Sequence, residues 1–100
     1  MLIKKPEFEG IYIFGSFLTS NMPNDLDLLV VYYSMKCQPK NIYNSVEPII
    51  LFLSAQTNLP IDLVLLTTQE EKSLNFKKIS KCQSILSIKK INYTQHGQYG

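Results

Sequence analysis

Three short apolar runs, rich in β-branched and aromatic residues, predict the strands of a sheet. They cover Ile11–Phe14, Leu26–Tyr32 and Ile61–Leu66. The first run stops at Gly15 and Ser16, where glycine lets the backbone turn without the steric cost of a Cβ atom. From Val64 to Leu66 the third run is apolar on both faces, which indicates a central or covered strand.

Apolar residues at helical spacing predict a helix between the second and third strands. The stripe consists of Ile42, Val46, Ile49, Ile50, Leu53 and Thr57. Pro48 interrupts this pattern, so it either kinks one helix or lies in the first turn of a helix capped by Ser45. The second alternative is favoured, because a proline in the first turn loses no helical hydrogen bond. We interpret the stripe as core packing against the sheet.

A second helix is predicted after the third strand, because Thr68-Gln69-Glu70-Glu71 matches a capping box. Its expected buried side is formed by Leu74, Ile79, Cys82 and Leu86. The segment from Ile85 to Tyr93 either continues this helix or forms a short last strand. Residues 94–100 are expected to be a loose tail of a single domain that covers residues 1–100.

Two carboxylates stand one residue apart at the start of the second strand. Side chains alternate along a strand, so Asp25 and Asp27 project from the same face with Cα atoms about 7 Å apart. Like charges at this spacing repel one another, and a sheet face favours apolar side chains. A divalent cation is the compensating group that this pattern indicates.

The order Gly-Ser at a strand end, a spacer, then Asp-x-Asp opening an apolar strand resembles the signature of the DNA polymerase β-like nucleotidyltransferase superfamily. In its short length the chain also resembles the minimal nucleotidyltransferase (MNT) branch of this superfamily, whose members are antitoxin-like. The resemblance implies an α/β (α+β) nucleotidyltransferase fold, a small mixed β-sheet with helices packed on one face. It also implies a third carboxylate on the next strand, where Asp62 stands. Without Asp25 and Asp27 in the sequence, Asp62 would be interpreted as an acid that caps the start of the strand or pairs with a lysine.

The resemblance implies metal-dependent transfer of AMP from ATP, or of NMP from another NTP, to an acceptor hydroxyl. Asp25, Asp27 and Asp62 would be the catalytic residues and the ligands of two Mg²⁺ ions, a site that also suits Mn²⁺. Asp62 would also act as general base. Gly15 and Ser16 would bind the nucleotide phosphates, with Ser16 capping a short helical turn through Thr19. Without the acids downstream, this Gly-Ser pair would be an ordinary turn.

The resemblance is compatible with three roles for the chain. Minimal members of the family often modify a partner protein, and a HEPN-type toxin neutralised by attached AMP is the partner that the resemblance implies. One alternative is a catalytically idle antitoxin that masks its partner. Another is a free-standing enzyme that modifies a small molecule.

Composition narrows the class of protein. The net charge of +2 gives no clear sign of nucleic-acid binding. Charged residues make up only 18%, below the roughly 25% of an average domain, which leaves apolar surface for a partner. No run is long enough for a membrane span, and no signal peptide is evident, so a cytoplasmic protein is expected. The lysines at 72, 77, 78 and 81 are interpreted as a solvated face, with contact to a triphosphate or a polyanion as the alternative.

Overall fold

The computed structural model describes residues 6–35 and 38–85, which form one sheet and four helices. In chain order the elements are β1 (Phe8–Phe14), α1 (Ser16–Thr19), β2 (Leu26–Tyr32), α2 (Pro39–Thr57), β3 (Ile61–Thr67), α3 (Thr68–Leu74), α4 (Phe76–Ile79) and β4 (Gln83–Ser84). The three predicted strands are confirmed. The first begins earlier than expected, because Phe8 is buried on the sheet and extends β1.

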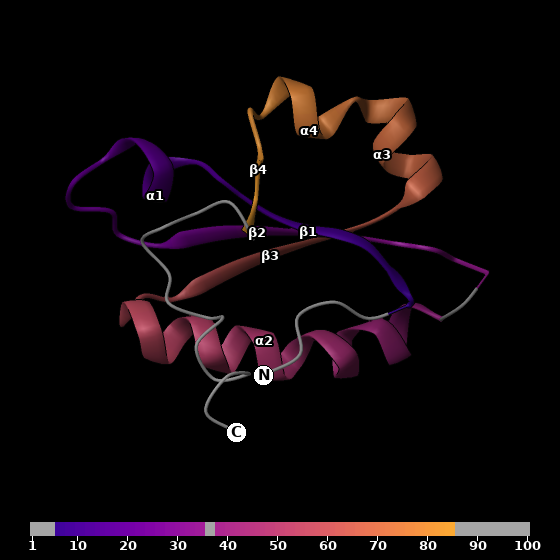
Figure 1. Ribbon diagram of the computed structural model, residues 1–100, viewed down its shortest axis with the longest axis horizontal. Helices are drawn as coiled ribbons and strands as arrows, with labels where there is room; N and C mark the ends of the chain where they lie inside the picture. Colours follow the sequence, from indigo (N-terminus) through magenta and orange to yellow (C-terminus); the bar gives the residue numbers. More distant parts are fainter. Residues whose placement is uncertain (1–5, 36–37, 86–100) are drawn as a thin grey trace.

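The sheet is mixed, with strand order β3-β2-β1-β4. β1 runs antiparallel to both β2 and β4, whereas β2 and β3 are parallel. A parallel pair needs a long crossover connection, and α2 supplies it. The mixed sheet and the α+β class are confirmed. The helices, expected on one face, lie on both: α2 covers one side of the sheet, and α3 and α4 lie on the other (Figure 1).

The main core lies between the sheet and α2. Alternate residues of β1 and β2 face this side, and they meet a fully buried stripe on the helix. The stripe consists of Ile42, Val46, Ile49 and Leu53. The expectation that these helical positions pack against the sheet is confirmed.

The expected start of α2 at Ser45 is wrong. The helix begins at Pro39, and Pro48 lies inside it. A helix of this length keeps Ile42 and Val46 in the buried stripe, and burial of an aliphatic side chain contributes about 1.5–3 kcal/mol. That gain offsets the cost of about 3 kcal/mol for an internal proline. Pro48 is on the exposed face, as is Asn44, the residue whose carbonyl loses its helical partner.

The opposite face of the sheet carries a smaller core of Leu29, Val31 and Leu66, against which Tyr12, Phe14, Val64, Phe76 and Cys82 pack. The helix start after β3 is confirmed, but the cap is Thr67 and not Thr68. The Thr67 hydroxyl accepts from the Glu70 N–H, and the Glu70 carboxylate accepts from the Thr67 N–H. This reciprocal pair satisfies two N–H groups that the helix itself cannot bond.

The expected buried side of the last helix is wrong for Leu74 and Ile79, which are 54% and 71% exposed. Asn75 has a left-handed backbone with φ 53°, so α3 ends there and α4 begins with a new axis. The helical periodicity is therefore broken, and Phe76 becomes the residue that packs on the sheet, edge-to-face with Phe14. Cys82 is half-buried.

The last described residues return to the sheet. β4 pairs with the middle of β1, with Ser84 opposite Tyr12, and Ile85 is 1% exposed. The predictions for Leu86, for the rest of the segment to Tyr93 and for the tail lie outside the described residues. No helix in residues 6–35 and 38–85 has the length and hydropathy of a transmembrane span.

Candidate metal and nucleotide site

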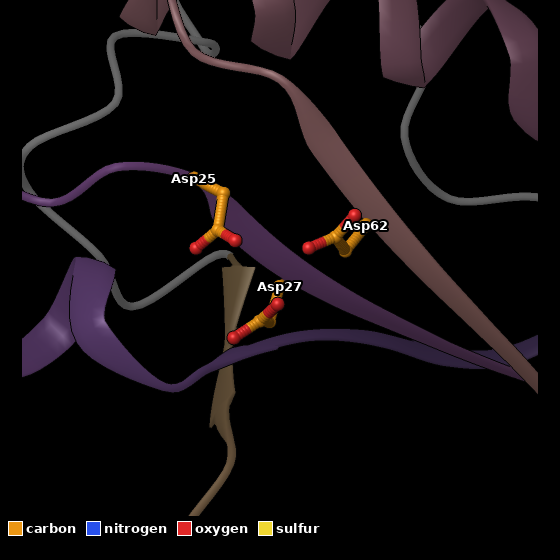
Figure 2. A group of neighbouring side chains, drawn as sticks. All are labelled: Asp25, Asp27 and Asp62. Atoms are coloured by element: carbon orange, nitrogen blue, oxygen red, sulfur yellow. The ribbon is translucent and has the colours of Figure 1, made fainter.

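Three carboxylates meet at the end of the sheet where β2 and β3 begin. Asp27 lies in β2 directly beside Asp62 in the parallel register, and Asp25 immediately precedes β2. All three project from the sheet face opposite α2, and each offers an oxygen within 4.8 Å of those of the other two. Figure 2 shows the carboxylates turned toward one another from the two strands. The predicted convergence of these acids is confirmed.

The close approach of the three acids raises the pKa values of two of them, Asp25 and Asp27. The pKa of Asp25 is raised, first by a hydrogen bond with Asp62, then by desolvation and the charge of Asp27. The pKa of Asp27 is also raised, first by desolvation and then by the charge and hydrogen bonding of Asp62. Within the described chain no lysine forms an ion pair with these acids, since the salt bridge found there joins Lys77 to Glu9. Among residues 6–35 and 38–85 the cluster therefore has no ion-pair partner.

This donor set fits a divalent cation. Carboxylate oxygens are the hard ligands that Mg²⁺ prefers, and Mn²⁺ accepts the same set. The oxygens are close enough to share one ion or to bridge two. The pKa values of Asp25 and Asp27 are raised by hydrogen bonding to Asp62, by desolvation and by the neighbouring charges, and a bound cation would favour the ionised forms.

Gly15 brings the end of β1 against the acids. Its φ is 79° and its ψ is −155°, a conformation found almost only in glycine. A Cβ atom built on it would collide with Oδ2 of Asp27. The preceding residue, Phe14, is the partner of Asp27 in the antiparallel register. Gly15 is therefore required both for the turn and for the close approach to the carboxylate.

The helical turn after Gly15 is confirmed as α1, but Ser16 does not cap it. Gly15 is the N-cap residue, Ser16 is the first residue of the helix, and no side chain caps α1. The carbonyl of Gly15 accepts from the N–H of Leu18 at 3.1 Å. Ser16 is exposed beside the acid cluster, so its hydroxyl is open to solvent or to a ligand.

A family model described as polymerase beta, nucleotidyltransferase, matches residues 1–91. The chain belongs to this nucleotidyltransferase family. Comparisons with the curated proteins and with the solved structures gave no significant match. The family match covers every strand and the three acids, and it agrees with the mixed sheet and the acid cluster.

In this nucleotidyltransferase domain, sequence reasoning missed a polar cluster on the same sheet face. Lys77 binds the Glu9 carboxylate at 3.3 Å, donates to the Tyr12 hydroxyl at 3.3 Å and lies 4.9 Å from the Tyr12 ring centroid. Tyr12 in turn donates to Glu9 at 3.0 Å. The only sequence signal for this cluster is the alternation along β1, which places Tyr12 and Phe14 on the same face of the strand. Lys77 thus has internal partners, whereas Lys72, Lys78 and Lys81 are exposed.

An open groove of about 590 Å³ lies at the same end of the nucleotidyltransferase domain. It runs between the α1–β2 connection and the end of α2, and Asn24, which lines it, directly precedes Asp25. The full lining is Phe17, Asn21, Met22, Pro23, Asn24, Gln56, Thr57 and Leu59. None of these side chains is charged, so the groove offers no cation to a triphosphate.

The acid cluster gives the metal-free nucleotidyltransferase domain a distinctive pH dependence. Asp25 and Asp27 have pKa values raised above 3.8 in the folded state, so between 3.8 and the raised values the folded state binds more protons than the unfolded state. Their contribution to stability therefore falls as pH rises through this window. We expect Asp27→Asn to be more stable than the wild type at pH 7 in EDTA.

The measurement is urea unfolding of both proteins in EDTA from pH 4 to pH 7. The advantage of Asp27→Asn should shrink toward pH 4, because the wild-type carboxyl then becomes neutral as well. A difference that is independent of pH would contradict the proposed repulsion.

Proposed function

We propose that this protein is a metal-dependent nucleotidyltransferase that transfers AMP from ATP, or NMP from another NTP, to an acceptor hydroxyl. The observation that carries the proposal is the convergence of Asp25, Asp27 and Asp62 within 4.8 Å in a chain of this family. In the reaction the acceptor oxygen forms a bond to the α-phosphorus, and the bond to pyrophosphate breaks. The hydroxyl proton passes to a base, and pyrophosphate leaves.

In this proposal Asp25 and Asp27 are the principal metal ligands and Asp62 completes the set. When bound, Mg²⁺, as two ions, neutralises phosphate charge and lowers the pKa of the attacking hydroxyl. Asp62 is the exposed member of the cluster and stands at the start of β3. That position suits a group that meets the acceptor from solvent and takes its proton as general base.

The phosphate contacts are assigned to Gly15 and Ser16. Gly15 has no side chain between the backbone and the Asp27 carboxylate, so a phosphate held near the acids can also approach the backbone here. The exposed Ser16 hydroxyl can donate to a phosphate oxygen. The uncharged groove beside Asn24 suits a part of a substrate that carries no phosphate.

We propose a partner protein as the source of the acceptor hydroxyl, in the role of an antitoxin for a HEPN-type toxin. The support is the resemblance to minimal nucleotidyltransferases, together with large apolar side chains that remain exposed. They are Met22, Tyr33, Met35, Tyr43, Leu51, Leu74 and Ile79. The same exposed residues favour a second candidate, an idle antitoxin that masks its partner without catalysis.

Thermal unfolding with Mg²⁺ and ATP tests the nucleotide site without knowledge of the acceptor. A ligand at 100 times its dissociation constant stabilises the folded state by about 2.7 kcal/mol. For a domain of this size the melting temperature should rise by roughly 4–8 °C per kcal/mol. Asp27→Asn should abolish the rise, and Ser16→Ala should reduce the part that depends on ATP more than the part from Mg²⁺ alone.

ATP with EDTA serves as the matched control, because the nucleotide is present but the cation is removed. A wild-type melting temperature that stays constant across millimolar Mg²⁺ and ATP would contradict a working nucleotide site. The idle antitoxin would then be the remaining candidate.

A further inference from the structure

The strand β3 has the composition of a central strand but lies at an edge of the sheet. Leu63, Val64, Leu65 and Leu66 form an unbroken apolar run, which is typical of strands covered on both faces and paired on both sides. Within residues 6–35 and 38–85, however, β2 is its strand neighbour on one side and no strand pairs with the other side. Sequence analysis predicted a central or covered strand, and the described part of the chain leaves its outer edge uncovered.

The side chains along this edge are incompletely buried. On the α2 face, Ile61, Leu63 and Leu65 pack against the main core together with Phe52 and Leu59, and all five are only partly buried. On the opposite face Val64 is half-buried as well. The edge therefore presents an apolar strip beside a row of backbone N–H and C=O groups.

Of the features that protect sheet edges from pairing with other chains, β3 has one charged residue, Asp62, near its start. Natural edge strands are short, or carry lysine, proline or a bulge. The opposite edge, β4, is two residues long. β3 is seven residues long, has no lysine or proline within it, and pairs with β2 in an unbroken register. Backbone groups of this kind bond to water or pair with another strand.

We propose that the outer edge of β3 pairs with β3 of a second copy of this chain, in an antiparallel, two-fold symmetric dimer. Pairing along the full strand places Val64 opposite Val64 of the partner and Leu63 opposite the partner's Leu65. Asp62 then faces the partner's Leu66, and the two Asp62 residues are separated by about 13 Å along the strands. That distance exceeds the Debye length of about 8 Å at physiological ionic strength.

This register favours a second copy as the occupant of the edge. At its centre, from Leu63 to Leu65, it pairs apolar residues with apolar residues on both faces, and it keeps the two Asp62 carboxylates apart. The symmetry axis is perpendicular to the sheet, so the two four-stranded sheets become continuous and both acid clusters lie on the same face. The inference does not depend on the proposed function, because it uses only β3 and the side chains beside it.

The sharpest test uses the residue that would face itself across the symmetry axis. Sedimentation velocity of the wild type should show twice the mass of one chain, with dissociation on dilution. Val64→Lys and Val64→Glu should each raise the dissociation constant at least tenfold, because like charges then lie directly opposite one another. An equimolar mixture of the two variants should restore the dimer as a mixed species, detected by native mass spectrometry.

Ile79→Lys is the matched control, since it adds the same charge at an exposed apolar residue of α4 and should leave the dimer intact. If the Val64 variants fail to fold, amide hydrogen exchange of the wild type still tests the proposal. Protection of Ile61–Thr67 should increase with protein concentration. A wild type that is monomeric at all concentrations, protection that is independent of concentration, or a dimer that both Val64 variants leave unchanged would overturn it.

Discussion

Replacement of both Asp25 and Asp27 by asparagine is expected to abolish magnesium-dependent transfer of labelled AMP from ATP while the fold remains intact. Asparagine keeps nearly the same shape, so the close contact of residue 27 with Gly15 is retained. The change removes two of the three charges that would hold the cation. Without these ligands the phosphate charge is not neutralised, and we expect activity to fall to the background of the assay.

The measurement is incorporation of label from α-labelled ATP into acceptor protein, with circular dichroism to verify folding. Glu47→Gln is a suitable control, because it removes one carboxylate from the exposed face of α2, away from the acid cluster. An idle antitoxin would neutralise its partner equally well with both aspartates changed. If the double variant gives full protection and the wild type yields no labelled product, the catalytic proposal is wrong.

Gly15→Ala should have the second large effect, because one added methyl group changes both the backbone and the site. The φ of 79° and ψ of −155° cost a non-glycine residue about 1–3 kcal/mol. The new Cβ would also collide with Oδ2 of Asp27 and push that carboxylate out of the cluster. We expect a melting temperature lower by roughly 4–8 °C per kcal/mol lost, together with loss of the stabilisation by Mg²⁺ and ATP.

A double-mutant cycle separates the two effects. In an Asp27→Ala background the carboxylate is absent, so Gly15→Ala should then cost only the backbone part of its effect. Equal costs of Gly15→Ala in both backgrounds would show that the contact with Asp27 is unimportant.

The acid cluster could be predicted from the sequence because it depends on short-range rules. Alternation in the extended chain that leads into β2 gives Asp25 and Asp27 a common face, and the family signature supplies Asp62 at the start of the next strand along the chain. The parallel register then places Asp62 beside Asp27. The strand centres were predictable for the same reason, since each is an apolar run with a clear end.

The features that were predicted wrongly depend on packing or on the backbone conformation of a single residue. Pro48 was expected near the start of a helix, but burial of Ile42 extends α2 back to Pro39. The exposure of Leu74 follows from the left-handed Asn75, and asparagine alone does not predict that conformation. The edge position of β3 depends on which strands pair, which a pattern of apolar residues cannot specify.

The parallel pairing of β2 with β3 also has a consequence for the order of folding. β1 and β2 are joined by a short connection, whereas the 19-residue α2 separates β2 from β3. Shorter loops close sooner and at a lower entropic cost, so we expect the β1–β2 pair to form first. Asp25 and Asp27 would then be in place before Asp62 arrives. A partly folded chain would thus carry an incomplete acid cluster, and tight metal binding would appear only when β3 docks.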